Sequence, residues 1–163
     1  MTTHYIHRGL AKKNFKENTL SAFKYSFKKK YGIETDLQVT KDNQLICFHD
    51  FNLRRKFKLN KNVKDINYSD LKKISNKRKA TVPLLKDLLK ISKNRYPLLL
   101  EIKPLLTKQG LLGLIKLIKK TKKYGIFSFK EKNLINLYKL NKKLSLGLRS
   151  EERRVGKECR SRW

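Results

Sequence analysis

The fold is decided by residues 33–50, which read IETDLQVTKDNQLICFHD. They contain two stretches, 33–39 and 45–49, that are each long enough to form a strand. Side chains of a strand point alternately to its two faces, so Glu34 and Asp36 share one face of the first stretch. Their two carboxylates are therefore expected to converge.

The two strands are predicted to form a hairpin. The residues between them are fewer than the roughly a dozen that a crossover between parallel neighbours requires. Asp42 and Asn43 tolerate turn conformations and would form a two-residue tip. This register would place His49 opposite Asp36, so that the turn itself would carry the histidine to the carboxylates.

Outside the hairpin, strand patterns alternate with amphipathic helical patterns. The other predicted strands cover 5–9, 98–103, 126–129 and 144–148. Helices are predicted at 19–30, 84–93, 111–123, with Gly125 as its end, and 134–140; residues 52–64 are predicted to be irregular, and Ser69 is predicted to cap a shorter helix. This alternation predicts an α/β fold with a mainly parallel sheet and about six strands present, an arrangement found in barrels of alternating strands and helices.

Carboxylates are scarce in this chain, and half of the ten that precede position 149 lie in or beside four short polar motifs. These motifs fall at predicted strand ends, where such barrels place their chemistry. The motifs are His7-Arg8, Glu34 with Asp36, His49-Asp50, and Glu101 with Lys103. Beside them, Glu17 is expected to cap the helix at 19–30, and Asp50 either to hold His49 or to cap a helix.

Glu34, Asp36 and Glu101 are candidate metal ligands. Three carboxylates held close together repel one another unless a cation neutralises them. The set is all oxygen, without a thiolate or a histidine pair at zinc spacing, so it favours Ca2+ or Mg2+ over zinc. A divalent ion at such a site polarises a phosphoryl oxygen and stabilises the negative charge that develops on it.

The other motif residues suit acid–base chemistry at a phosphate. His7 and His49 are candidate catalytic residues, a proton acceptor and a proton donor, because imidazole titrates near neutral pH. Arg8 can hold a phosphate oxygen with its fork, and Lys103 can add positive charge or orient Glu101. Together, the motifs predict a metal-assisted phosphodiesterase.

The formal net charge of +29 raises the alternative of a basic nucleic-acid-binding protein. Before position 149, however, the cations are 31 Lys against 5 Arg, scattered along the chain, whereas nucleic-acid surfaces use Arg forks and interleaved aromatics. We therefore expect a small-molecule substrate and no specific nucleic acid.

No apolar run approaches the roughly 18 residues of a membrane span, and the N-terminus lacks a leader pattern, so a cytoplasmic protein is expected. The oligomeric state stays open.

Seven segments, in their order and spacing, resemble the glycerophosphodiester phosphodiesterase family. They are HRG at 7–9, ENTLSAF at 17–23, IETDLQVTKDNQLICFHD at 33–50, NL-x-R at 52–55, VPLLKDLL at 82–89, EIK at 101–103 and SF at 128–129. The resemblance implies a TIM-type (β/α) barrel, incomplete in this chain, that is related to the phosphatidylinositol-specific phospholipases C. It also implies hydrolysis of glycerophosphodiesters to glycerol 3-phosphate and an alcohol, with a neighbouring glycerol hydroxyl attacking phosphorus first.

The same resemblance implies roles and a length. It implies that Glu34, Asp36 and Glu101 are the metal ligands and that His7 and His49 are the acid–base pair. It also implies that Arg8 and Lys103 bind the substrate phosphate. A complete barrel has eight strands and about 250 residues. Residues 1–148 are therefore expected to be a partial barrel domain that lacks the last two strand–helix units. Residues 149–163 change abruptly to an arginine-rich composition and resemble translated vector DNA, so a non-native tail is expected. An inactive barrel fragment is the second alternative.

Overall fold

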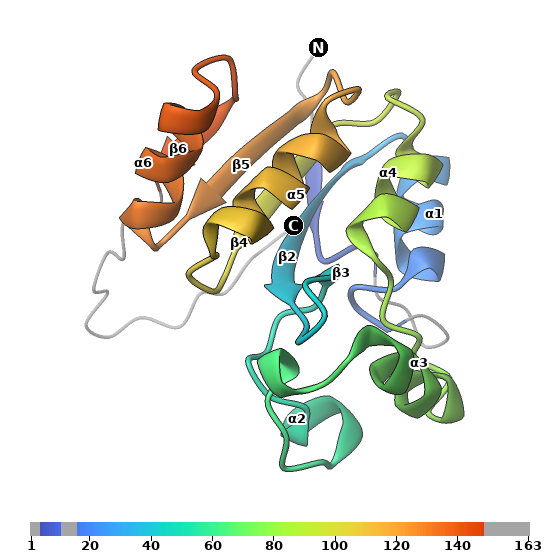
Figure 1. Cartoon of the computed structure of the whole chain (residues 1–163). Helices are drawn as coiled ribbons and strands as arrows, with labels where there is room; N and C mark the ends of the chain where they lie inside the picture. The colour runs from blue at the N-terminus through green and yellow to red at the C-terminus, as the bar shows by residue number, and fades with distance from the viewer. Residues whose placement is uncertain (1–3, 11–15, 149–163) are drawn as a thin grey trace, which may run out of the picture.

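The computed structural model describes residues 4–10 and 16–148, so the predicted tail at 149–163 lies outside the described residues. Within the described ranges, six strands form one sheet in the order β1-β2-β4-β5-β6, with β3 paired to β2 off this path (Figure 1). The strands are β1 (Tyr5–His7), β2 (Gly32–Val39), β3 (Leu45–Cys47), β4 (Leu98–Ile102), β5 (Tyr124–Ser128) and β6 (Leu146–Leu148). The helices are α1 (Leu20–Lys28), α2 (Arg54–Phe57), the 3-10 helix η1 (Val63–Asp65), α3 (Tyr68–Lys77), α4 (Leu85–Ser92), α5 (Lys108–Ile118) and α6 (Glu131–Leu140).

Neighbouring strands along the main path are all parallel, which confirms the predicted α/β fold. β3 is the exception, because it runs antiparallel to β2. β1 and β3 pair with the same edge of β2: β1 pairs with the N-terminal half of that strand and β3 with the C-terminal half. The predicted number of six strands is right for the sheet. Five of the described strands belong to the parallel succession, against eight in a complete barrel. The prediction that the last two strand–helix units of the barrel are lacking counts the hairpin strand β3 as one of the barrel strands.

The β2–β3 hairpin forms as predicted, but its register is shifted by one residue. Leu37 pairs with Cys47, and beyond this pair the backbone N–H of Phe48 donates to the carbonyl oxygen of Asp36 at 2.9 Å. Phe48 therefore lies opposite Asp36, and the predicted pairing of His49 with Asp36 is wrong. Because β3 ends at Cys47, strand alternation does not fix the direction of the His49 side chain.

The length of the hairpin loop explains the shift. The tip has three residues, 41–43, because Thr40 N donates to Gln44 O at 3.1 Å and Gln44 N donates back to Thr40 Oγ1 at 3.1 Å. Asn43 has a φ of 56°, the left-handed conformation that closes three-residue hairpin loops. A two-residue tip would have needed two successive residues in that conformation.

The start of α3 is set by a contact that is distant in sequence. Its N-cap is Asn67, and the predicted cap Ser69 lies inside the helix. The first N–H groups of a helix need acceptors from outside it. Tyr68 N donates to Asp42 Oδ1 in the β2–β3 loop at 2.9 Å, so a residue 26 positions away satisfies the first turn.

Two further boundaries differ from the predictions. α5 ends at Ile118, and Gly125, predicted to end it, lies inside β5. A Cβ at Gly125 would come within 3.0 Å of Leu99 Cδ2, so the glycine gives this β4 side chain room to pack. The stretch 52–64, predicted to be irregular, contains α2 and η1. None of the helices in the described ranges is long and apolar enough to cross a membrane.

The sheet packs against helices α1, α4, α5 and α6 through one large core (Figure 1). Its fully buried members from β2, β4 and β5 are Ile33, Leu37, Leu98, Leu100, Ile102 and Ile126. A second core, which includes Ile46, Phe57 and Leu71, lies among β3, α2 and α3. β3 serves both cores because its side chains alternate: Leu45 and Cys47 belong to the first and Ile46 to the second. The segment after the hairpin is thereby fixed to the sheet.

Leu114→Ala, in the buried stripe of α5, is expected to lower the free energy of unfolding by about 2–4 kcal/mol, because it removes apolar contacts and leaves a cavity. Leu112→Ala on the same helix is the matched control. Its side chain is 47% exposed, so the loss should stay below about 1 kcal/mol. Urea unfolding followed by circular dichroism measures both variants. Equal losses would contradict the placement of α5 on the sheet.

Candidate active site

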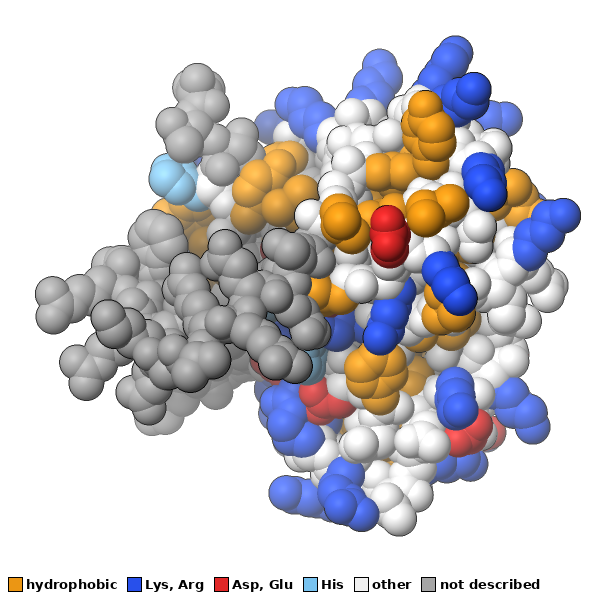
Figure 2. All heavy atoms as spheres, turned by 90° about the vertical axis from the view of Figure 1, so that its left-hand side faces the viewer, with side chains coloured by type: hydrophobic (Ala, Val, Ile, Leu, Met, Phe, Trp, Pro, Cys, Tyr) orange, Lys and Arg blue, Asp and Glu red, His pale blue; other side chains and the backbone are white. Residues whose placement is uncertain are grey.

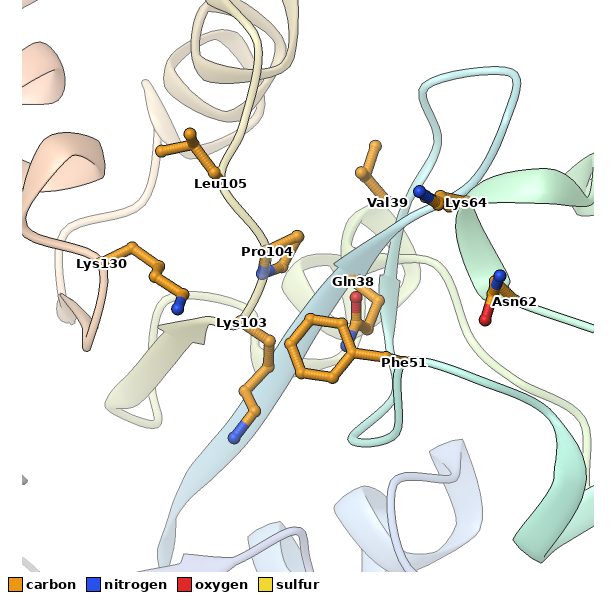
Figure 3. A pocket seen from close by; sticks show the side chains of 9 residues that line it. All are labelled: Gln38, Val39, Phe51, Asn62, Lys64, Lys103, Pro104, Leu105 and Lys130. Carbon is orange, nitrogen blue, oxygen red and sulfur yellow. The ribbon is translucent and has the colours of Figure 1, made fainter.

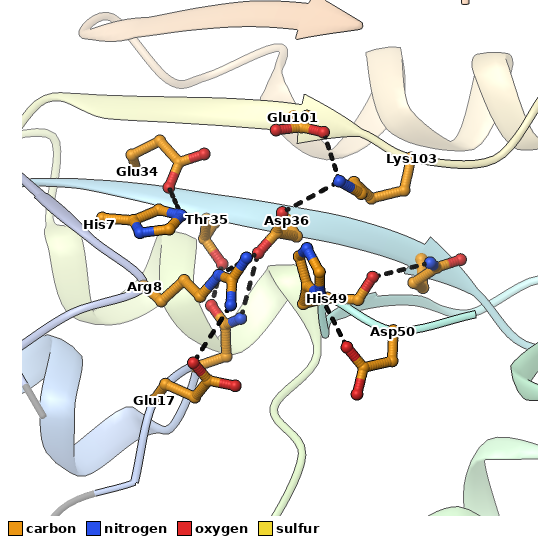
Figure 4. Close-up of polar contacts among 12 residues, drawn as sticks. His7, Arg8, Glu17, Glu34, Thr35, Asp36, His49, Asp50, Glu101 and Lys103 are labelled. Carbon is orange, nitrogen blue, oxygen red and sulfur yellow. Dashed lines mark hydrogen bonds and ion pairs between the residues drawn. The ribbon is translucent and has the colours of Figure 1, made fainter. Parts of the chain in front are cut away.

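Three carboxylates converge on the face of the sheet opposite the helices. Glu34 and Asp36 project from alternate positions of β2, and the parallel register puts Glu101 of β4 beside Asp36. One oxygen from each residue lies within 4.8 Å of the other two (Figure 4). All three residues are buried. The structure thus brings together the residues that the sequence singled out as candidate ligands.

His7 ends β1 at the edge of this cluster. It pairs with Glu34 in the parallel ladder, its Nε2 lies 3.6 Å from Glu34 Oε2, and 66% of its side chain is exposed. The chain then turns sharply, because Arg8 and Gly9 both have positive φ, 58° and 76°. A Cβ at Gly9 would lie 2.9 Å from the Phe23 ring, so this turn requires glycine on two grounds.

Arg8 and Asn18 hold Asp36 from the side of α1. Arg8 Nε lies 3.0 Å from Asp36 Oδ2, and Arg8 Nη1 donates to Glu17 Oε2 at 3.2 Å. Asn18 Nδ2 donates to Asp36 Oδ2 at 3.4 Å, while Asn18 Oδ1 accepts from Thr35 Oγ1 at 2.7 Å. Sequence reasoning missed Asn18. Its place in the ENTLSAF segment was the only sequence feature that could have indicated a role in the site. Its contact with Asp36 forms only because the chain folds back toward β2 after the turn that follows β1.

Lys103 faces the cluster from the end of β4. Its Nζ lies 2.8 Å from Glu101 Oε1 and 3.8 Å from Asp36 Oδ1, and only 17% of the side chain is exposed. Lys103 and Arg8 together supply two positive charges to three carboxylates. The remaining negative charge and the all-oxygen donor set fit a hard divalent cation such as Ca2+ or Mg2+.

His49 is oriented by its neighbour Asp50. His49 Nδ1 lies 2.7 Å from Asp50 Oδ1, and the His49 carbonyl accepts from Gln38 Nε2 at 3.2 Å. Of the two expected roles of Asp50, the structure shows the contact with His49. An ionised carboxylate acceptor fixes the ring proton on Nδ1 and leaves Nε2 for the substrate side. In Figure 4 the His49 ring points toward Asp36 and Lys103.

Arg55 joins the His49 side of the site to the β1 turn. Arg55 Nε lies 2.7 Å from Asp50 Oδ2, and Arg55 Nη2 lies 2.7 Å from Glu17 Oε1. Because Glu17 binds arginine side chains, its predicted role as a helix cap is wrong. Thr19 caps α1, since its Oγ1 accepts from Ala22 N at 3.3 Å. Sequence reasoning assigned no role to Arg55, although it ends the NL-x-R segment.

The two carboxylates that Arg55 binds stay charged. Burial raises the pKa of Glu17, but the hydrogen bonds from Arg55 and Arg8 and the nearby charge of Lys56 hold it below its ordinary value. Burial also raises the pKa of Asp50, and the hydrogen bonds from Arg55 and His49 again lower it below its ordinary value. Both carboxylates are therefore ionised at neutral pH and keep the network closed.

Lys56 is a second group that sequence reasoning missed. Its Nζ donates to the carbonyl oxygen of Glu17 at 2.8 Å and lies 5.5 Å from the centre of the Phe48 ring. Burial lowers the pKa of Lys56 to about 8, with the negative charge of Glu17 acting against this shift and the positive charge of Arg55 adding to it. No sequence signal distinguishes this lysine from the many others of the chain.

Comparisons with known proteins agree with this geometry. Residues 7–155 match the glycerophosphoryl diester phosphodiesterase family. A glycerophosphodiester phosphodiesterase of Bacillus altitudinis is 34% identical over 110 residues, which cover 63% of this chain and 44% of that protein. A human lysophospholipase D is 39% identical over 72 residues, which cover 44% of this chain and 23% of that protein.

Solved structures match over almost the whole chain. The glycerophosphodiester phosphodiesterase of Thermotoga maritima has a TM-score of 0.76 at 24% identity, covering 93% of this chain and 64% of its own. An Oleispira antarctica phosphodiesterase, solved with the product sn-glycerol-3-phosphate, has a TM-score of 0.77 at 20% identity. The match covers 90% of this chain and 65% of that phosphodiesterase. The chain therefore spans about two thirds of these solved chains and less than half of the two sequence relatives.

These matches define the class of fold first: the sheet and its helices are part of a TIM-type α/β barrel. The match over residues 7–155 then gives the family. The chain belongs to the glycerophosphoryl diester phosphodiesterase family, which is a family of phosphoric diester hydrolases.

Lys56 is expected to titrate near pH 8 when its side-chain 13Cε resonance is followed by NMR, with Lys56→Arg used to assign the signal. Glu17→Gln should move the midpoint lower, because the Glu17 charge favours the protonated amine. The unfolded chain holds this proton to a higher pH, so the contribution of Lys56 to stability rises between about pH 8 and the ordinary lysine value near 10.4. A midpoint above 10 would contradict the burial of this amine.

Proposed function

We propose that this site hydrolyses glycerophosphodiesters to glycerol 3-phosphate and an alcohol, with Ca2+ or Mg2+ held by Glu34, Asp36 and Glu101. The observation that carries the proposal is the convergence of these carboxylates from neighbouring strands within 4.8 Å, in a chain of the phosphodiesterase family. The product held by the Oleispira antarctica relative supports the same product class.

The charged groups around the cluster would bind the phosphate. Arg8 and Lys103 both lie beside Asp36 and would each hold a phosphate oxygen. A bound divalent cation would neutralise the carboxylates and polarise the phosphoryl oxygen. Each of these groups attracts the negative charge that grows on the phosphate as its bond to the alcohol breaks.

His7 and His49 would carry the protons. His7, exposed at the end of β1, would remove a proton from the attacking hydroxyl, either the neighbouring glycerol hydroxyl or water. His49, held through Nδ1 by Asp50, would in its doubly protonated form give the Nε2 proton to the oxygen of the leaving alcohol and keep its Nδ1 proton on the Asp50 side. If water attacks, glycerol 3-phosphate would form directly. If the glycerol hydroxyl attacks, a cyclic phosphodiester of glycerol would form, and water would open it to glycerol 3-phosphate in a second step, with His49 now accepting the proton of water and His7 returning its proton to the glycerol oxygen.

An inactive barrel fragment is the second candidate. It is favoured by the five parallel strands of the described residues and by the position of His7 at the end of β1 and of Arg8 directly after it, since β1 pairs with β2 alone among the described strands. A nucleic-acid-binding role has less support. On the face shown in Figure 2, the lysine and arginine side chains are spread among other residues instead of forming a continuous stripe.

The first test separates metal binding from turnover. Isothermal titration of the chain with Ca2+ and with Mg2+ should show a site that Glu34→Gln, Asp36→Asn and Glu101→Gln each weaken on the order of tenfold or more, because each removes a charged ligand. Asp70→Asn, on the exposed surface of α3, is the matched control and should bind normally. Unchanged binding in all three variants would refute the ligand assignment.

The second test measures release of glycerol 3-phosphate from a glycerophosphodiester in the presence of the ion. His7→Ala and His49→Ala should each slow turnover on the order of a hundredfold or more, since general acid–base terms have that size. His4→Ala, an exposed histidine outside the cluster, should keep full turnover. A chain that binds the ion but releases no product would count against catalysis by this chain and favour the inactive fragment.

A further inference from the structure

A pocket of about 490 Å³ opens beside the carboxylate cluster (Figure 3). Two of its lining residues connect it to the candidate site. Gln38 lies on the same face of β2 as Asp36, and Lys103 forms part of the pocket wall while its Nζ lies 2.8 Å from Glu101 Oε1. A diester whose phosphate lay at Lys103 would therefore extend one of its two halves into this pocket.

The volume of the pocket favours the alcohol half. Cavities of about 300–1,000 Å³ accommodate whole small-molecule ligands, so this pocket is far larger than a three-carbon glycerol needs. Part of its wall is apolar: Phe51 and Leu105 are 54% and 56% exposed and border the pocket. Such side chains pack on the carbon skeleton of an alcohol and displace water from the charges nearby.

The polar part of the pocket is cationic. Lys64 from η1 and Lys130 from the β5–α6 connection line it in addition to Lys103, and Figure 3 shows these two lysines on opposite sides of the pocket. None of the described residues that line the pocket is acidic. The salt bridges of the described residues join neither Lys64 nor Lys130 to a carboxylate. Their charges are therefore available to a ligand.

We propose that this pocket receives the alcohol half of the diester and selects alcohols that carry a negative charge, such as a phosphorylated polyol. The inference rests on the proposed function only in placing the phosphodiester at Arg8 and Lys103. A negative group in the pocket would lie between Lys64 and Lys130, which border the pocket on opposite sides, and both ammonium groups would attract it.

A quaternary ammonium alcohol such as choline fits this pocket poorly. Sites that recognise quaternary ammonium groups surround them with several aromatic faces. Among the residues 4–10 and 16–148, Phe51 is the single aromatic residue that lines the pocket, and three lysine side chains line it too. Repulsion from Lys64, Lys103 and Lys130 would outweigh one cation–π contact.

The test compares two diesters on the 163-residue chain with divalent ion present: glycerophosphoinositol 4-phosphate, whose alcohol is anionic, and glycerophosphocholine, whose alcohol is cationic. Phosphorus NMR reads binding from the diester line width and reads turnover from the glycerol 3-phosphate signal, so each is measured separately. The variant carries Lys64→Gln and Lys130→Gln. The matched control carries Lys28→Gln and Lys122→Gln, two exposed lysines outside the pocket, and has the same net charge.

The anionic diester should bind roughly five- to tenfold more tightly than the choline diester at low salt, and the preference should shrink as salt screens the lysines. The pocket variant should lose this preference, and the control should keep it. Equal affinity for the two diesters, or an equal loss in pocket variant and control, would overturn the proposal. If both diesters are hydrolysed but bind equally well, the proposed function is supported and the pocket assignment is refuted. If the anionic diester binds more tightly but neither diester is hydrolysed, the pocket assignment is supported and the proposed function is not.

Discussion

The arrangement of the candidate site depends on keeping three buried carboxylates together. Two like charges about 4 Å apart repel by roughly 4 kcal/mol at the effective dielectric constant typical near a protein surface. The sheet forces Asp36 and Glu101 into adjacent positions, so the repulsion must be balanced locally. Arg8 and Lys103 supply part of the balance through contacts of 3.0 and 2.8 Å. The same imbalance that would cost stability would favour binding of the divalent cation that we propose for this cluster.

A second constraint is that both histidines lie where a strand ends. His7 is the last residue of β1, which pairs with β2 alone among the described strands, and His49 lies beyond the end of β3. Arg55 bridges these segments through Glu17 and Asp50, with both contacts at 2.7 Å. The arginine itself lies on α2, which is fixed by the second core. Packing of the segment that follows β3 and carries α2 is thereby coupled to the orientation of His7 and His49, the two residues proposed to transfer protons.

The seven candidate site residues all lie between positions 7 and 103: some are on β1, β2 and β4, and the others directly follow β1, β3 and β4. The part of the barrel that the described residues form therefore already holds the whole constellation, even though the chain spans about two thirds of the solved relatives. The exposed position of β1 matters most, because a closed barrel pairs both edges of every strand. In the described residues the β1 turn is held instead by Asn18, whose N–H donates to the carbonyl oxygen of Arg8 at 2.8 Å.

The sequence by itself determined the α/β class, most element positions and the shared face of Glu34 and Asp36, because strand and helix periods are local properties of the chain. It did not determine the hairpin register, since that depends on whether Asn43 closes a three-residue loop, and a one-residue difference changes which residue faces Asp36. It also left out Arg55, Lys56 and Asn18. Their contacts form only when the segment after β3 and the turn after β1 pack against each other, and no local pattern encodes an encounter between positions 38 residues apart, such as Glu17 and Arg55.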